Sequence, residues 1–107
     1  MVITDTLSQL DATHHRVTLV PSGEIDAGNV ESLSDSIHEA LLSGAYEIDL
    51  DLAEVSFLDT AALEVLEGAR DALESTGGHL CIRNPTPPVR RLLSLTAFTP
   101  SCSTPHG

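Results

Sequence analysis

The residues best placed to carry chemistry lie where an apolar segment leads into a helix-forming segment. Residues 55–58 are mostly apolar, Asp59 and Thr60 follow, and helically spaced apolar positions begin at Leu63. The first turn of a helix offers unpaired backbone N–H groups and the positive end of the helix dipole. A hydroxyl there can be exposed, and a phosphate attached to it can be partly accommodated. The pair therefore has two interpretations: a simple N-cap, or a phosphate-accepting hydroxyl at Thr60.

Motifs of the common enzyme classes are absent from the sequence. It contains no GxGxxG or GxxxxGK[ST] loop, no HExxH motif and no GxSxG elbow. None of the five histidines has a Cys, Asp or Glu partner at a recognised ligand spacing. We therefore expect a protein that is not an enzyme, with no catalytic residues, no metal site and no cofactor. Cys81 is expected to be an inert buried hydrophobe and Cys102 a free thiol, with a Cys81–Cys102 redox pair as the alternative.

The charge distribution favours a protein partner. The chain of 107 residues has 16 acidic and five basic side chains, which gives a formal net charge of −11. Such a surface repels nucleic acid and anionic membranes, so neither is an expected partner. It attracts a protein with a basic face, although solubility alone would also account for the acidity.

The length and composition fit one domain, residues 1–98, followed by a flexible tail, residues 99–107. Periodicity predicts strands near residues 3–10, 17–20, 46–52 and 79–83, and helices with apolar positions at 30–41, 63–73 and 89–96. Pro21-Ser22-Gly23 is expected to end the second strand. The predicted helix caps are Asp26 or Asn29 for the first helix, and Asp59 or Thr60 for the second.

The order β-β-α-β-α-β-α predicts an α/β (α+β) fold. We expect a mixed four-stranded sheet with an antiparallel first pair, parallel strands after it, and helices mainly on one face. Residues 46–52 alternate between apolar and acidic side chains, so one face of this strand is left to solvent or to a partner. No apolar run reaches the ~20 residues of a membrane-spanning helix, and the first residues do not resemble a signal peptide, so a cytoplasmic protein is expected.

Several blocks of the sequence resemble the STAS-domain family of anti-sigma-factor antagonists. Residues 22–26, Ser-Gly-Glu-Ile-Asp, are similar to the family's G-E-[LI]-D. Residues 51–60 are similar to its D-L-S-x-V-x-F-[LIM]-D-[ST] block, and residues 88–96 to its P-x-V-x-R-[LV]-L-x-[LI]-[ST] helix. The resemblance covers roughly residues 14–98 and implies a STAS-like fold.

The resemblance also implies a function, that of a bacterial stress-response regulator of transcription that works by partner switching. Such proteins bind an anti-sigma factor that is also a GHKL-type serine/threonine kinase, and this binding releases a sigma factor. The kinase phosphorylates the hydroxyl residue after the Asp of D-[ST], here Thr60, which ends the binding, and a phosphatase acting on Thr60 restores it. The partner-binding residues implied are Glu24, Asp26, Asp59, Thr60, Ala61, Leu63 and Glu64.

Two other functions stay open at this point. One is a STAS scaffold or subunit without phosphorylation control, such as the accessory protein of a lipid-transporting ABC system, where a D-T-[AG] pattern also occurs. The other is a small-ligand or nucleotide-binding domain, which no phosphate loop supports. The sequence departs from the family pattern at Thr60-Ala61-Ala62, where the family often has Ser-Ser-Gly.

Overall fold

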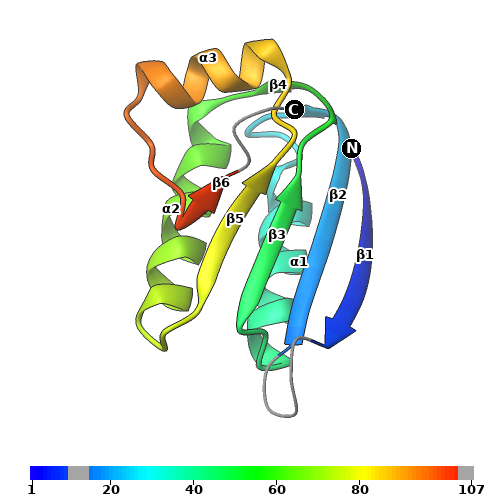
Figure 1. Ribbon diagram of the computed structural model, residues 1–107. Helices are drawn as coiled ribbons and strands as arrows, with labels where there is room; N and C mark the ends of the chain where they lie inside the picture. The colour runs from blue at the N-terminus through cyan, green and yellow to red at the C-terminus, as the bar shows by residue number, and fades with distance from the viewer. Residues whose placement is uncertain (10–14, 104–107) are drawn as a thin grey trace.

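A mixed β-sheet, with two helices packed on one of its faces, forms the body of the protein (Figure 1). The computed structural model describes residues 1–9 and 15–103, and for residues 8, 9, 102 and 103 it describes only the backbone. The strands are β1 (Val2–Gln9), β2 (His15–Ile25), β3 (Glu47–Asp51), β4 (Glu54–Leu58), β5 (His79–Arg83) and β6 (Cys102–Ser103). The helices are α1 (Val30–Leu42), α2 (Thr60–Glu74) and α3 (Pro87–Leu95).

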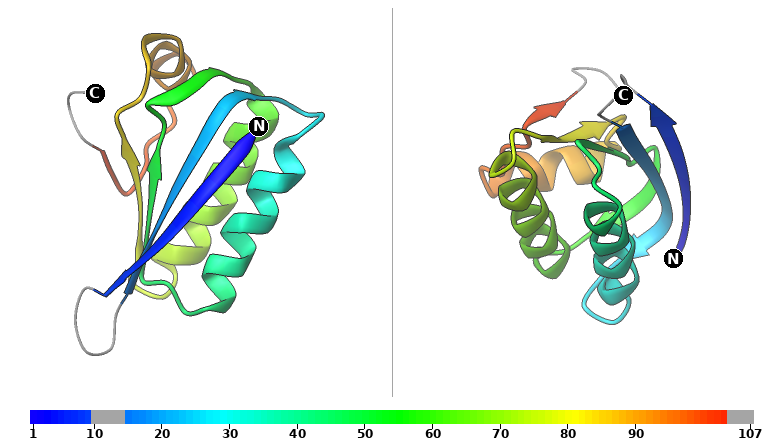
Figure 2. Two further views of the ribbon diagram at one scale, coloured as in Figure 1. Left: turned by 90° about the vertical axis from the view of Figure 1, so that its right-hand side faces the viewer. Right: turned by 90° about the horizontal axis from the view of Figure 1, so that it is seen from below.

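The strand order confirms the predicted fold class. Strands run β1-β2-β3-β5-β6 across the sheet, and β4 also pairs with β2. The β1–β2 pair is antiparallel and the other pairs are parallel. Helices α1 and α2 lie side by side on one face, whereas α3 crosses one end of the sheet (Figures 1 and 2). The sheet has six strands where the sequence predicts four, because β4 and β6 were not anticipated.

Strand β2 does not end at Pro21 as predicted but continues to Ile25. Gly23 has a φ of 91°, and the pairing register with β4 shifts between Gly23 and Glu24. Proline and glycine inside a strand mark bulges as well as ends, and here they mark a bend. Residues 16–19 of β2 pair with β3, and residues 22–25 pair with β4.

Residues 101–103 lie against β5, whereas the sequence predicts them as part of a flexible tail. The Ser101 N–H donates to the Leu80 carbonyl at 2.9 Å, and the Leu80 N–H donates to Ser101 Oγ at 3.0 Å. The two-residue β6 then pairs with β5, which places the Cα of Cys102 opposite Cys81. Cys81 is buried, as the sequence predicts, but it is disulfide-bonded and therefore not the inert hydrophobic side chain that was expected. The Cys102 side chain and residues 104–107 lie outside the described residues.

The core lies between the sheet and the α1–α2 layer, as the alternation in β3 predicts. Ile48 and Leu50 of β3 are fully buried beside helix residues such as Leu33 and Leu66. The alternate residue, Asp49, belongs to the sheet face without these helices, yet it is only 6% exposed. A buried carboxylate on that face needs compensation from neighbouring charges.

Candidate functional site

Asp59 caps α2 and sets Thr60 at the first helical position. The Asp59 backbone is extended, and its Oδ1 accepts hydrogen bonds from the N–H groups of Ala61 at 3.0 Å and Ala62 at 3.3 Å. Of the two predicted caps, Asp59 is the one that the structure confirms. The Thr60 side chain is exposed, as expected for a modifiable hydroxyl. Another protein can therefore reach this hydroxyl at the positive end of the helix.

The loop between β2 and α1 is held against the same aspartate. The Ala27 N–H donates to Asp59 Oδ2 at 3.2 Å, and the Asp59 N–H donates to the Ile25 carbonyl at 3.1 Å. Two segments that resemble separate family motifs, residues 22–26 and 51–60, are therefore held side by side.

The loop is also braced from within. Asp26 Oδ1 accepts a hydrogen bond from the Gly28 N–H at 2.9 Å. Asn29 occupies the N-cap position of α1, but its side chain makes no cap hydrogen bond to the helix. Its Oδ1 instead accepts from the Asp26 N–H at 3.0 Å, and its Nδ2 donates to the Glu24 carbonyl at 2.9 Å. These bonds give the loop a defined shape next to Thr60.

The structure brings most of the predicted partner-binding residues to the surface around Thr60. Exposed or half-buried among them are Glu24, Asp26, Asp59, Thr60, Ala61 and Glu64. Leu63 differs, because it is 5% exposed and belongs to the core cluster. Its place in the apolar stripe of α2 turns it inward, so its side chain supports the helix and does not belong to the contact surface.

Phe57 was not anticipated as a surface residue. It is 48% exposed and stands in register with Glu24 on the neighbouring strand, which brings an aromatic ring to this same surface. The sequence shows residues 55–58 only as a mostly apolar segment before the helix, and it does not reveal β4, which turns Phe57 outward. A shallow groove of ≈ 250 Å³ between α1 and α2, lined in part by Glu64 and Val65, continues the surface. The site is therefore acidic with apolar elements, which suits binding to a protein.

A second group of charges lies on the sheet face without α1 and α2. Arg16 of β2 and Arg83 of β5 flank Asp49, with N–O distances of 3.5 and 3.6 Å, and they also approach Glu47 at 3.6 and 3.8 Å. Burial raises the pKa of Asp49 from 3.8 to about 6, and Glu47 adds to this through a hydrogen bond and its charge. The two arginines oppose the rise in pKa.

This group does not make a convincing metal site. Ligand atoms of Glu47, Asp49 and Cys81 lie within 4.8 Å of one another in the described part of the chain. Cys81 is disulfide-bonded, however, and so offers no thiolate. Both carboxylates are already shared with Arg16 and Arg83, whose positive charges oppose cation binding.

Comparison with known proteins identifies the family of this chain. A model of the STAS domain matches residues 8–105. The chain belongs to the STAS-domain family. An anti-sigma F factor antagonist of Paenibacillus polymyxa is 31% identical to this STAS domain over 93 residues, which are 84% of this chain and 80% of the relative.

Solved structures share the fold of this STAS domain. The unphosphorylated anti-sigma factor antagonist SpoIIAA superposes with a TM-score of 0.76 and 22% identity, covering 94% of this chain and 88% of SpoIIAA. The phosphorylated form of the Bacillus cell fate determinant SpoIIAA gives a TM-score of 0.68 at 22% identity, covering 94% of this chain and 91% of the other. None of the helices in the described residues is long and apolar enough to span a membrane.

Proposed function

We propose that this STAS domain is a cytoplasmic anti-sigma-factor antagonist whose binding is switched off by phosphorylation of Thr60. The observation that carries the proposal is the exposed Thr60 hydroxyl at the start of α2, next to the Asp59 cap. The P. polymyxa relative is an anti-sigma F factor antagonist, and SpoIIAA is known with and without its phosphate, which supports the same function. The partner is an anti-sigma factor that is also a GHKL-type kinase, and a phosphatase acts on Thr60.

In the unmodified protein, the partner contacts the surface formed by the β2–α1 loop, Phe57 and the first turn of α2. The carboxylates of Glu24, Asp26 and Glu64 give this surface a negative charge, so a basic face on the partner is steered toward it. The half-exposed Phe57 ring offers the aromatic contact that often contributes strongly to binding energy.

Phosphorylation changes the same surface. The kinase transfers the γ-phosphoryl group of ATP to Thr60 Oγ, ADP leaves, and the hydroxyl proton passes to a base of the kinase. The phosphate adds about −1.5 to −2 charges one helical turn from Glu64 and next to Asp59. It competes with the Asp59 carboxylate for the N–H groups of α2, and it repels that carboxylate, which also holds Ala27. The modified surface is therefore both more negative and less well ordered around the loop.

Calorimetric titration against the cognate kinase tests the proposal. Thr60→Ala should fold and bind like the unmodified protein, because Asp59 and not Thr60 supplies the cap. Enzymatically phosphorylated protein should bind most weakly, and Thr60→Glu should lie between. The penalty for Thr60→Glu is under about 1 kcal/mol at an exposed rim and several kcal/mol in a desolvated interface. Thr76→Glu is the matched control, since it adds the same charge at an exposed position beyond the other end of α2.

Equal affinity for all forms would exclude the phosphorylation switch. That result would favour a constitutive STAS scaffold or the accessory subunit of a lipid-transporting ABC system. Affinity purification from cell extract then separates the functions by the ATPase recovered: a soluble histidine-kinase-like ATPase supports the antagonist, and a membrane transporter ATPase contradicts it.

A further inference from the structure

A groove on the opposite side of α1 from α2 has no part in the site around Thr60. It has a volume of ≈ 370 Å³ and lies between β1 and the second half of α1. Asp5 and Leu7 of β1 form one wall, and Glu39 and Ser43 of α1 form the other. Figure 2, left, shows β1 and α1 beside each other along this side of the molecule. The loop that adjoins Thr60 precedes α1, so the groove lies toward the far end of that helix.

Strand β1 presents a free edge along this groove. It is the first strand in the sheet order, and among the described residues only β2 pairs with it. Natural edge strands are commonly protected by charged side chains, lysine above all, by proline or by a bulge. β1 (Val2–Gln9) contains neither lysine nor proline, its one charged side chain is Asp5, and its register with β2 is unbroken over all eight residues. Its outer N–H and C=O groups can therefore pair with an added strand.

The side chains of the groove indicate what kind of strand would bind. Asp5 and Glu39 are carboxylates, and among the residues that the structure describes no cationic side chain lines the groove. Leu7 is 68% exposed at the rim, while Val17 and Ala40 form a buried apolar floor. A second copy of this chain, at a net charge of −11, would bring its own Asp5 against that of its partner and is disfavoured. A basic segment meets the opposite charge.

We propose that the β1–α1 groove binds an extended, basic segment of a partner protein, which adds to β1 as a further strand of the sheet. Main-chain hydrogen bonds to β1 supply the register, as in other strand-addition complexes. Alternate residues of the segment face the groove, so basic side chains approach Asp5 and Glu39, and the alkyl stem of such a side chain packs on Leu7. This surface is independent of the proposed function of Thr60.

A synthetic probe tests the surface without knowledge of the natural partner. The probe is an acetylated, amidated heptapeptide of alternating lysine and valine, titrated into ¹⁵N-labelled full-length protein. We expect amide shifts concentrated in Val2–Gln9 and in the second half of α1, with slower hydrogen exchange in β1. A control peptide is N-methylated at the backbone nitrogens that would pair with β1, which leaves its charge unchanged. This peptide should bind about tenfold or more weakly, because it lacks those main-chain hydrogen bonds.

Charge variants provide a second measurement. Asp5→Asn combined with Glu39→Gln should weaken binding about threefold to tenfold, in the range expected for two exposed ion pairs. The matched control combines Glu54→Gln with Glu67→Gln, two exposed acids outside the groove, and should change binding less than about twofold.

Three results would overturn the proposal. The first is equal weakening by both double variants together with undiminished binding of the N-methylated peptide, which would indicate non-specific attraction. The second is the absence of binding up to millimolar peptide. The third is a concentration-dependent dimer in sedimentation, with β1 amides protected when no peptide is present, which would make a second copy the occupant.

Discussion

The carboxylate of Asp59 holds the backbone of Ala27, with 3.2 Å between Asp59 Oδ2 and the Ala27 nitrogen. Its other oxygen caps α2 through Ala61 and Ala62. One side chain thus fixes both the helix that carries Thr60 and the neighbouring loop. A change at Thr60 can therefore alter the position of Ala27, because the Asp59 carboxylate contacts both the first turn of α2 and the Ala27 N–H.

Asp59→Asn should separate the two roles of Asp59, which are to cap α2 and to hold the Ala27 N–H. The amide carbonyl oxygen can still accept from Ala61 and Ala62, but the NH₂ group then faces the Ala27 N–H and cannot accept from it. Asp59→Asn should therefore keep most of the stability while hydrogen exchange at Ala27 becomes faster. Asp59→Ala loses the cap as well and should lower the free energy of unfolding by about 0.5–2 kcal/mol.

The control for charge is Asp35→Asn, because Asp35 is an exposed acid on α1. It should leave exchange at Ala27 unchanged. If Asp59→Asn also leaves that exchange unchanged, the Asp59–Ala27 hydrogen bond does not order the loop.

Two glycines, Gly68 inside α2 and Gly78 shortly after its C-terminal end, should respond in opposite ways to alanine. A Cβ at Gly78 would overlap the Tyr46 carbonyl oxygen and lie 3.2 Å from that of Leu73, both of them backbone atoms. Gly78→Ala should therefore lower the free energy of unfolding by about 1–3 kcal/mol or more. Gly68 is exposed inside α2 with no atom within 4 Å of such a Cβ. Gly68→Ala should raise stability by about 0.5–1 kcal/mol, and urea denaturation measures both.

The features that local patterns determine could be predicted from the sequence. The cap at Asp59 and the helix after it follow from residue types within a few positions of each other. At Leu63 the helical periodicity was a better guide to burial than the family resemblance. The helical spacing of Leu63 predicts a core residue and the family resemblance implies a contact residue, and in the structure it is buried.

The features that long-range pairing determines could not be predicted. Pro21 and Gly23 are typical of a strand end, and only the presence of β4 beside them turns that end into a bend. The hydrogen bonds between Ser101 and Leu80 likewise join residues that are far apart in the sequence. Ser101 lies in a segment without apolar periodicity, so no local pattern predicts them. Periodicity reports which face of an element is buried, but it does not report which distant strand lies beside it.

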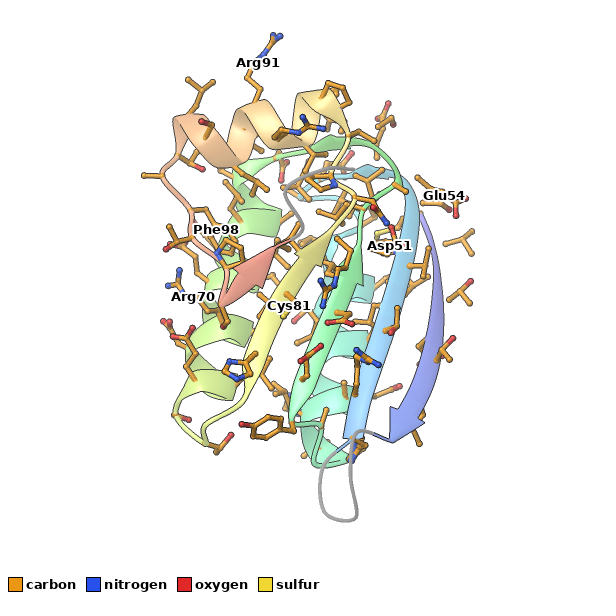
Figure 3. All side chains as sticks on the ribbon, in the orientation of Figure 1. Asp51, Glu54, Arg70, Cys81, Arg91 and Phe98 are labelled. Atoms are coloured by element: carbon orange, nitrogen blue, oxygen red, sulfur yellow. The ribbon has the colours of Figure 1, made fainter. Side chains whose placement is uncertain are left out.

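Arg70 should stabilise the segment after α3. Its Nη1 donates to the Thr99 carbonyl at 2.9 Å, and its guanidinium carbon lies 5.4 Å from the centre of the Phe98 ring (Figure 3). Arg70→Ala removes a charged hydrogen bond and a cation–π contact, so it should lower the free energy of unfolding by about 1–2 kcal/mol. Chemical denaturation measures the loss.

Arg91 offers the matched control for Arg70. It is exposed on α3 and points away from the rest of the protein (Figure 3). Arg91→Ala should change stability by less than about 0.5 kcal/mol. Equal losses for the two variants would mean that general charge, and not the contact with Phe98 and Thr99, accounts for the effect of Arg70.

Asp49 should make the stability of the protein depend on pH in the mildly acidic range. Burial raises its pKa from 3.8 to about 6, so between these values the folded protein holds a proton that the unfolded chain has released. The contribution of this group to the free energy of unfolding therefore falls as the pH rises from about 4 to about 6, and it is constant above that range. The fall is at most about 3 kcal/mol, because one pKa unit corresponds to about 1.4 kcal/mol.

Asp49→Asn keeps the shape of the side chain but cannot ionise, so it should remove this fall in stability. Loss of the contacts with Arg16 and Arg83 adds an offset to the stability, whereas loss of the ionisation of Asp49 changes how the stability varies with pH in this range. Relative to wild type, the variant should gain about 2–3 kcal/mol in free energy of unfolding between pH 4 and pH 7. Urea denaturation at four pH values across that range measures the gain, and Asp35→Asn, at an exposed site, should follow the wild-type curve. A difference between Asp49→Asn and wild type that stays constant with pH would show that the Asp49 carboxyl ionises at its ordinary pKa, and that Arg16 and Arg83 fully compensate its burial.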